Sequence, residues 1–298
     1  MTTQASKPSQ AAEATAVYGL GPGPDETARL RRQSRELEPE ALALLARIGL
    51  RPGQAAIDLG CGPAGILNLL ASAVSPGGRV VGLDADPVHV AMAGQHARER
   101  GFGDVEVLTG DARRTGLPAD AFDLVHTRTL LVTIPRPAEV VSEMVRLAKP
   151  GGWVASQEPD AGISLCYPPL AAWDRLLDLF GKSFCRSGAD LRIGRRLPSL
   201  LRHAGLQDVE ATMYASNYPA GHTRRTVMVD LVGGLRPVIV ELGLASEAEL
   251  TDLDSAVREH LADPDTLMMP HLMVTAWGRK PALRQPRRAP GRPPSPTR

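Results

Sequence analysis

A glycine-rich segment is the first feature of this sequence whose residue types and spacing could bind a ligand. Residues 58–65 read DLGCGPAG, and glycines let a ligand approach the backbone closely. An expected helix begins just after them, and the free N–H groups of a helix N-terminus suit polar and anionic groups. The segment also matches the GxGxxG fingerprint of dinucleotide-binding proteins, although glycine is common in any tight strand–helix turn. The segment alone therefore does not identify the ligand.

Two carboxylates follow the next two expected strands. Asp84 ends one strand, where an acidic side chain can accept hydrogen bonds from both hydroxyls of a ribose. Asp111 follows the other strand in the sequence Gly110-Asp111-Ala112, where it can accept a hydrogen bond from the exocyclic amine of an adenine. These residues predict a ligand with an adenosine group, and both a nicotinamide cofactor and S-adenosylmethionine fit that description.

The elements that must position these residues alternate along the chain. Expected strands cover residues 55–59, 79–83, 105–108, 122–126 and 153–157, and expected helices cover residues 38–48, 66–73 and 138–148. A further helix is expected to start at Asp86-Pro87, with Asp86 as its N-cap and Pro87 at the first position. This alternation predicts a parallel sheet with helices on both faces.

The pattern changes after residue 158. Apolar residues recur at steps of three and four from Leu170 to Phe184, which predicts a helix with a core-facing stripe. The other expected elements are a helix at 197–206, a strand at 208–215, a helix opened by the capping box Ser246-x-x-Glu249, and a last strand at 272–277.

Five motifs occur in order along the first half of the chain. They read AIDLGCGPAG, VVGLDADP, TGDA, FDLVHTR and LAKPGGWV. Together they closely resemble the class I S-adenosylmethionine-dependent methyltransferases over roughly residues 54–158, in particular the small-molecule (natural-product) methyltransferases of high-GC bacteria. The late stretch VTAWGRK resembles that family's closing strand. The resemblance implies an α/β fold: a Rossmann-like, doubly wound, seven-stranded sheet with an antiparallel last strand, plus helical cap insertions.

Composition and the resemblance together divide the chain into three parts. Residues 1–16 are polar, Ala-rich and without periodicity, and residues 281–298 form a Pro/Arg-rich tail, so both ends are expected to be disordered. Residues 17–280 are expected to form the methyltransferase domain, with cap insertions at about 160–194 and 222–263.

The resemblance also implies a set of cofactor contacts. Gly60, Cys61 and Gly62 would pack on the methionine and ribose parts of S-adenosylmethionine, with the Cys61 side chain as a small filler, not a nucleophile. Asp84 would hold the ribose hydroxyls. Asp58 would order the glycine loop or meet the amino group of the methionine part, although it could also simply cap a turn.

Five further residues are implied on the adenine and methyl sides of the cofactor. Ala85 would flank the adenine, and Asp111 with Ala112 would face its amine, although Asp111 could instead be an N-cap. Thr127 and Arg128, at the end of the fourth strand, would lie beside the transferred methyl group.

An N-terminal stretch resembles the leader helix of natural-product methyltransferases. Tyr18-Gly19-Leu20-Gly21 is followed by the pattern Glu26-x-x-Arg29-Leu30-x-x-Gln33. In those enzymes such a segment folds over the cofactor, where it would exclude water from the sulfonium. Tyr18 and Gln33 are therefore candidate cofactor contacts, and a solvated amphipathic helix is the alternative.

His126 and Glu158 are candidate catalytic residues, as general bases or as substrate contacts. His126 suits proton transfer by residue type, but a lone histidine on a central strand is more often packed or hydrogen-bonded. Glu158 ends the fifth strand at the mouth of the sheet, where it could touch the substrate or pair with Arg128. Other candidates near this edge or in the cap are Asp160, Tyr167 and His222.

The composition limits the partners. The chain has 298 residues and a formal net charge of +1, and residues 281–298 carry five Arg and no acidic residue, so the rest of the chain is slightly acidic and a nucleic-acid partner is disfavoured. The most apolar long stretch, residues 228–245, carries three charged residues, so no membrane span is expected. The three cysteines lie far apart, and Arg128 follows strand four where a metal site would need carboxylates, so no metal is expected. A cytoplasmic protein is expected, and a homodimer is compatible with these features.

The combined features predict an enzyme that transfers a methyl group from S-adenosylmethionine to a small, partly apolar acceptor, at oxygen, nitrogen or carbon. The resemblance places it in bacterial secondary metabolism, as in antibiotic biosynthesis. The alternative on the same fold uses the cofactor structurally for a non-methylating reaction such as cyclisation. A binding module with a dead pocket is disfavoured by the intact glycine loop with Asp84 and Asp111. A nicotinamide oxidoreductase is disfavoured because Asp58, TGDA and KPGG occur together.

Overall fold

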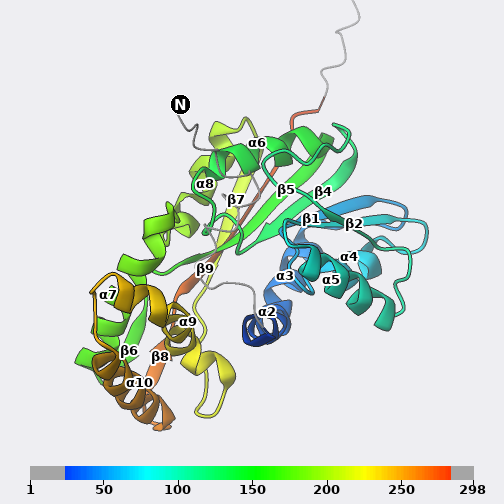
Figure 1. Ribbon diagram of the computed structural model, residues 1–298. Coiled ribbons are helices and arrows are strands. Elements are labelled where there is room, and N and C mark those ends of the chain that lie inside the picture. Colours follow the sequence, from blue (N-terminus) through cyan, green and yellow to red (C-terminus); the bar gives the residue numbers. More distant parts are fainter. Residues whose placement is uncertain (1–23, 283–298) are drawn as a thin grey trace, which may run out of the picture.

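A seven-stranded sheet forms the centre of the computed structural model, which describes residues 24–282 (Figure 1). The strand order is β3-β2-β1-β4-β5-β9-β7. The strands are β1 (Ala55–Leu59), β2 (Arg79–Asp84), β3 (Glu106–Thr109), β4 (Phe122–Arg128), β5 (Ala148–Asp160), β7 (Gln207–Tyr214) and β9 (Leu272–Arg279). Neighbours from β3 to β5 pair in parallel, and β9 is antiparallel to both β5 and β7. The predicted sheet, with its antiparallel last strand, is confirmed.

Helices cover both faces of this sheet, as a doubly wound fold requires. On one face, buried residues of α3 (Glu38–Ile48), α4 (Leu67–Val74) and α5 (Pro87–Glu99) pack against alternate residues of the central strands, such as Ala56. On the other face, α6 (Pro137–Leu147) and α8 (Ile193–His203) pack against the intervening residues, such as Ile57. Parallel strands buried on both sides must be apolar at almost every position, which is why the sequence reveals them clearly.

Local signals in the sequence set several boundaries correctly. The predicted helix 38–48 and strand 55–59 match α3 and β1 residue for residue. Asp86 accepts a hydrogen bond from the Val88 N–H as the N-cap of α5, and Ser246 accepts one from the Glu249 N–H as the N-cap of α10 (Glu247–Ala262). Both caps satisfy N–H groups that the first turn of a helix leaves unpaired.

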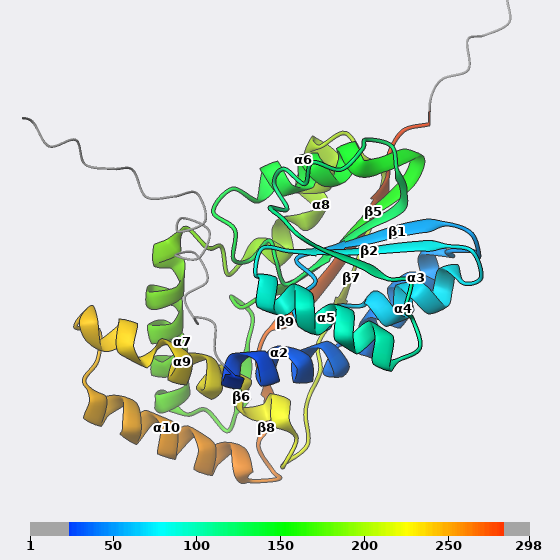
Figure 2. The same cartoon turned by 45° about the vertical axis from the view of Figure 1, so that its right-hand side comes forward.

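A cap of helices lies beside the carboxyl end of β5 (Figures 1 and 2). It consists of α7 (Ala171–Phe184), α9 (Val227–Glu241) and α10, with the short helices η1 (Cys185–Ser187) and η2 (Thr223–Thr226). Two short strands that the sequence did not predict, β6 (Leu165–Tyr167) and β8 (Leu267–Met269), pair in antiparallel fashion within it. No helix in residues 24–282 combines the length and apolar character that a membrane span requires.

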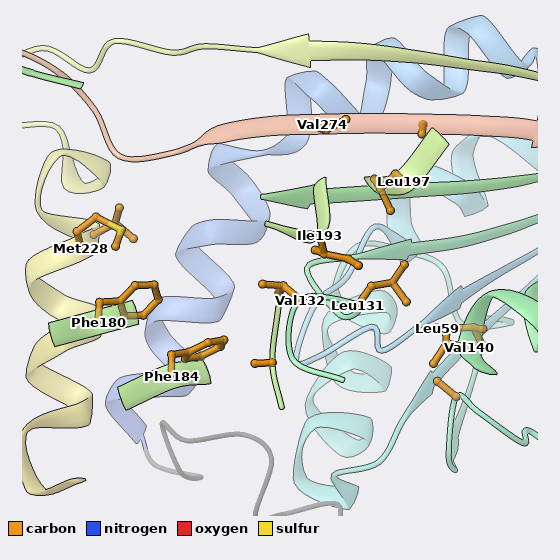
Figure 3. Close-up of a cluster of buried hydrophobic side chains, with 14 of the residues drawn as sticks. Leu59, Leu131, Val132, Val140, Phe180, Phe184, Ile193, Leu197, Met228 and Val274 are labelled. Carbon is orange, nitrogen blue, oxygen red and sulfur yellow. The ribbon is translucent and has the colours of Figure 1, made fainter. Parts of the chain in front are cut away.

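One hydrophobic core joins the cap to the sheet. The apolar stripe predicted from Leu170 to Phe184 is largely buried, and Phe180 and Phe184 face Met228 of α9 (Figure 3). In the same view Val132 and Ile193 lie between these cap residues and the side chains that cover the sheet. Many apolar residues of α9 belong to this shared core, so they hold the cap against the sheet.

Candidate functional site

The loop between β1 and α4 lies at the carboxyl edge of the sheet. Its three glycines with positive φ angles differ in what surrounds them. Gly60, Gly62 and Gly65 all have positive φ angles, of 68°, 58° and 53°. A Cβ on Gly60 would lie 2.8 Å from the Leu130 side chain, and one on Gly65 would lie 2.6 Å from Asp58 Oδ2. A Cβ on Gly62 would meet no atom of residues 24–282 within 4 Å. Gly60 and Gly65 are therefore fixed by internal packing, whereas the loop at Gly62 faces open space.

A chain of buried hydrogen bonds braces this loop. Asp58 Oδ2 accepts from the Ile66 N–H at 3.1 Å, and Asp58 Oδ1 lies 2.8 Å from His126 Nδ1. His126 Nε2 lies 3.3 Å from Gln157 Oε1, and the amide nitrogen of Gln157 donates a hydrogen bond to Thr275 Oγ1. Asp58 thus orders the loop, one of its predicted roles. His126 is fully buried with both ring nitrogens occupied, a geometry that favours positioning over proton transfer to a substrate.

Glu158 has a similar bracing position at the end of β5. Its Oε1 accepts from the N–H groups of Leu130 and Leu131 at 3.1 and 3.0 Å, and its Oε2 accepts from that of Val132 at 3.1 Å. Burial raises the pKa of Glu158 to about 7, and the three N–H groups act in the opposite direction. The carboxylate therefore fixes the turn after β4. The predicted alternative that Glu158 pairs with Arg128 is wrong, because the Arg128 side chain reaches a different element.

Arg128 connects the end of β4 to α2 (Pro24–Glu36). Its guanidinium donates to the Leu37 carbonyl at 3.1 Å and to Ser34 Oγ at 3.0 Å. Thr127 donates its hydroxyl to the Leu59 carbonyl at 2.9 Å, so this side chain is turned into the sheet. Thr129 has a φ of 54°, which is strained for a β-branched residue and typical of functional sites.

The helix α2 crosses the ends of β1 and β4 and also reaches the cap (Figure 2). Ser34 Oγ donates to the Gly65 carbonyl at 2.6 Å, and Gln33 Nε2 lies 3.3 Å from Thr129 Oγ1. At its end, Glu36 accepts a hydrogen bond from Thr223 of η2. The predicted leader helix is therefore present and Gln33 lies at the edge of the site. Tyr18 lies outside the described residues.

Asp84 ties the glycine loop to the end of β2. Its Oδ2 accepts from the Gly62 N–H at 2.8 Å and its Oδ1 from the Asp86 N–H at 3.0 Å. The side chain keeps 14% of its surface exposed, and the neighbouring Ala85 is exposed. His89, which the sequence analysis did not select, lies 3.6 Å from Asp84, and the nearby carboxylate raises the pKa of His89. A partly exposed carboxylate beside an open loop can accept hydrogen bonds from hydroxyl groups of a ligand.

Two other predicted contacts have partners within the protein. Asp111 accepts hydrogen bonds from the backbone and the guanidinium of Arg113, which lowers the pKa of Asp111, and its neighbour Ala112 is buried. No helix begins after Asp111, so the N-cap alternative is wrong: the carboxylate instead caps a turn at residues 111–114. An adenine contact stays a prediction. Burial raises the pKa of the Cys61 thiol well above its usual value, as expected of a filler.

The remaining candidate bases differ in their surroundings. Asp160 is buried and forms an ion pair with Arg195. Tyr167 is exposed on β6. His222 stacks on a neighbouring tyrosine ring with centroids 4.8 Å apart, and its Nδ1 accepts from the backbone N–H of Arg224. Sequence reasoning missed Arg224 itself, a buried arginine in η2 that no motif marks.

Comparison with known sequences gives one family. Residues 50–187 match a family described as "Methyltransferase domain". The chain is 30% identical over 190 residues to the demethylmenaquinone methyltransferase of Geobacillus sp. (strain WCH70), covering 60% of this chain and 81% of that one. It is 38% identical over 122 residues to the nocamycin O-methyltransferase of Saccharothrix syringae, covering 41% and 43%. It is 35% identical over 163 residues to an uncharacterised transposon protein of Streptomyces fradiae, covering 54% and 46%. The chain thus spans less than half the length of the last two relatives.

Solved structures share the fold. A putative methyltransferase from Bacillus halodurans superposes with a TM-score of 0.58 at 19% identity, covering 81% of this chain and 99% of that one. Phosphoethanolamine N-methyltransferase 2 of Haemonchus contortus, solved in complex with S-adenosyl-L-methionine, gives a TM-score of 0.52 at 19% identity, covering 82% and 52%.

Proposed function

We propose that this chain, which belongs to the S-adenosylmethionine-dependent methyltransferases, transfers the methyl group of that cofactor to a small-molecule acceptor of bacterial secondary metabolism. The observation that carries the proposal is the contact between Gly62 and Asp84, which brings a partly exposed carboxylate to an open glycine loop. The similarity to the nocamycin O-methyltransferase supports the biosynthetic role. The similarity to demethylmenaquinone methyltransferases points to a different acceptor, so similarity alone does not select one.

The residues present fit the cofactor. The open side of Gly62 can receive the methionine and ribose parts, and Asp84 can exchange its bond to the loop for bonds to ribose hydroxyls. Ala85 is exposed where it would flank the adenine. When bound, the cofactor supplies a methyl group on a positively charged sulfur, which a nucleophilic atom of the acceptor can displace in line.

The chain's own residues then act by positioning. The Asp58–His126 pair holds the glycine loop, and Glu158 holds the turn at 130–132, so both walls of the site are fixed before a ligand arrives. Such preorganisation lets binding energy align the reacting atoms, an effect worth up to about 7–11 kcal/mol in favourable cases. The helix α2 lies over these strand ends, where it can exclude water.

Isothermal titration calorimetry with S-adenosylmethionine tests the cofactor site. We expect binding by the wild type and at least tenfold weaker binding by Asp84→Ala, because charge-assisted hydrogen bonds to the ribose are lost. Asp86→Ala is the matched control: it removes the N-cap of α5 two residues away and should lower stability by about 1 kcal/mol without changing affinity. Folded wild-type protein that binds no cofactor would refute the proposal.

A second measurement separates methyl transfer from a cyclisation that uses the cofactor structurally. Extracts of small molecules are incubated with the enzyme and S-adenosylmethionine, and demethylated cofactor is quantified. Methyl transfer releases one molecule of S-adenosylhomocysteine per acceptor converted. Conversion of an acceptor without that release would support the cyclisation alternative instead.

A further inference from the structure

The side chain of Arg224 is buried without enough hydrogen-bond acceptors. Only 3% of the residue is exposed, and within residues 24–282 its Nε and Nη1 atoms have no hydrogen-bond partner. Its one side-chain hydrogen bond goes from Nη2 to His271 Nε2, at 3.2 Å. The nearest carboxylate is Glu36, 3.7 Å from Nη1, which is within ion-pair range but too far for a hydrogen bond. Buried cationic donors that lack acceptors cost considerable free energy.

The next residue, Arg225, is a buried arginine whose guanidinium has hydrogen-bond acceptors within the protein. Arg225 is equally buried, with 2% exposed, but its guanidinium donates to four backbone carbonyls. These carbonyls belong to Tyr218, Leu261, Asp263 and Thr266. The cap can therefore satisfy a buried guanidinium completely, and it does so one residue away from Arg224. The unsatisfied donors of Arg224 are a specific feature of its position.

The surroundings hold Arg224 in place without supplying hydrogen-bond acceptors for Nε and Nη1. The Tyr218 ring centroid lies 5.6 Å from its guanidinium carbon, in cation–π range. Burial and, to a smaller extent, the charge of Arg224 lower the pKa of His271 to about 3, so His271 is a neutral acceptor. The Glu36 carboxylate already accepts a hydrogen bond from Thr223. Nε and Nη1 have no hydrogen-bond acceptor among residues 24–282 and are shielded from solvent, so a group that binds them must displace the side chains that cover them.

Arg224 lies on the acceptor side of the proposed methyl-transfer site. His271 directly precedes β9, whose first residue Leu272 pairs with Asp160 at the carboxyl end of β5. Glu36 ends α2, the helix that covers the ends of β1 and β4. The charge of Arg224 is also felt at Arg128 on β4, where burial lowers the pKa and Arg224 lowers it further. These contacts place Arg224 between the cap, α2 and the sheet edge.

Resting on the proposed function, we infer that Arg224 binds an anionic oxygen of the methyl acceptor, either a carboxylate or an ionised enol or phenol. The guanidinium is planar, with Nε–H on one edge and Nη1 on the opposite side, so each of the two unpaired positions offers its own charge-assisted donor to an anionic oxygen. An anionic methyl acceptor supplies a hydrogen-bond acceptor that Arg224 lacks within the protein, and its negative charge offsets the buried positive charge. Arg224 thereby selects anionic acceptors over neutral ones of the same shape.

Matched pairs of small probes test this selectivity. Saturation-transfer NMR with enzyme loaded with S-adenosylhomocysteine compares benzoate with benzamide, and 4-nitrophenolate with 4-nitroaniline. We expect the wild type to prefer the anion of at least one pair by tenfold or more, and Arg224→Met to reduce that preference below about threefold. The first pair reports a carboxylate acceptor and the second an ionised phenol or enol. Equal binding within both pairs, or a preference that survives Arg224→Met, would overturn the inference.

Two control variants separate anion binding from a structural role. Arg236→Met, on α9, removes an arginine that pairs with Glu247 and should leave the preference unchanged. Glu36→Gln removes the competing negative charge near Nη1 and should strengthen anion binding. If Glu36 were instead the structural partner of Arg224, Glu36→Gln and Arg224→Met would lower the thermal midpoint alike and leave the preference unchanged, which would refute the inference.

Calorimetry on the same proteins keeps the two proposals apart. Arg224→Met should bind S-adenosylmethionine as the wild type does, because Arg224 lies on the acceptor side. A wild type that binds no cofactor refutes the proposed function, whereas normal cofactor binding without anion preference refutes only the role of Arg224.

Discussion

The ends of β1 and β5 and the junction between η2 and β9 both bury charged side chains, but these side chains have different hydrogen-bond partners in the two regions. At the strand ends, Asp58 and Glu158 accept hydrogen bonds from backbone N–H groups of neighbouring loops. At the junction, Arg224 keeps two donors without acceptors. Buried polar groups are normally satisfied, so a region satisfied internally holds a shape, and a region with unsatisfied donors indicates a partner from outside. The first region is therefore scaffold for the site, and the second recognises a ligand.

The largest expected effect on stability comes from replacing each of the two adjacent arginines by methionine. Arg225→Met should lower the free energy of unfolding by about 4 kcal/mol or more, because four buried carbonyls lose their donors. Arg224→Met should change it by less than about 1 kcal/mol, because few hydrogen bonds are lost and a buried charge is removed. Urea denaturation of both variants measures the difference. Equal losses would show that both arginines are structural and would remove the contrast between the regions.

The second prediction concerns the pH dependence of the strand-end region. Burial raises the pKa of Glu158 to about 7, above its ordinary value of 4.5. Its contribution to stability is therefore fully present below about pH 4 and is lost as the pH rises through about 7. The change amounts to about 3 kcal/mol. Urea denaturation across this range should show stability falling with pH more steeply in the wild type than in Glu158→Gln, and parallel profiles would contradict the raised pKa.

Sequence reasoning predicted most of the scaffold because the scaffold depends on local signals. The strand at 55–59 is apolar throughout, the Asp86-Pro87 pair starts a helix, and the Ser246 capping box starts another. By contrast, β4 and β5 extend beyond their predicted ends. Residues beyond the predicted ends, such as Thr127 and Asp160, are polar yet buried, because hydrogen bonds to neighbouring segments satisfy them. Polarity in the sequence was therefore a misleading guide to where these strands end.

The recognition region could not be predicted for a related physical reason. Arg224 and Arg225 are identical neighbours in the sequence, and only the packing of distant segments distinguishes them. Four carbonyls from residues 218–266 converge on one guanidinium, and none reaches the Nε or Nη1 of the other. Likewise, β6 and β8 are three-residue strands about a hundred residues apart, too short to have a periodicity of their own. Such features follow from tertiary contacts that no local pattern encodes.

The third prediction tests whether the strand-end network serves the cofactor. Asp58→Asn leaves an NH₂ group facing either the Ile66 N–H or His126, so it should cost about 2 kcal/mol of stability and disorder the glycine loop. We expect S-adenosylmethionine to bind about tenfold more weakly, measured by calorimetry. Asp123→Asn is the matched control, since Asp123 accepts from the Ala55 N–H and pairs with Lys149 at the opposite edge of the sheet. It should destabilise the fold without changing affinity, and equal losses of affinity would show a general rather than a local effect.

The smallest expected change in stability comes from adding a single methyl group to the glycine loop. The same substitution tests directly whether the cofactor binds there. Gly62→Ala strains a residue with a φ of 58° but meets no atom of residues 24–282 within 4 Å, so the free protein should lose only about 1 kcal/mol. The same is expected of Gly49→Ala, at the C-cap of α3, where φ is 67° and no atom of the described residues lies within 4 Å. If the cofactor packs on the open side of Gly62, that variant alone should bind S-adenosylmethionine at least tenfold more weakly. Since the two substitutions cost the fold the same, unchanged affinity in Gly62→Ala would mean that this open side is solvent and that the cofactor lies elsewhere on the sheet edge.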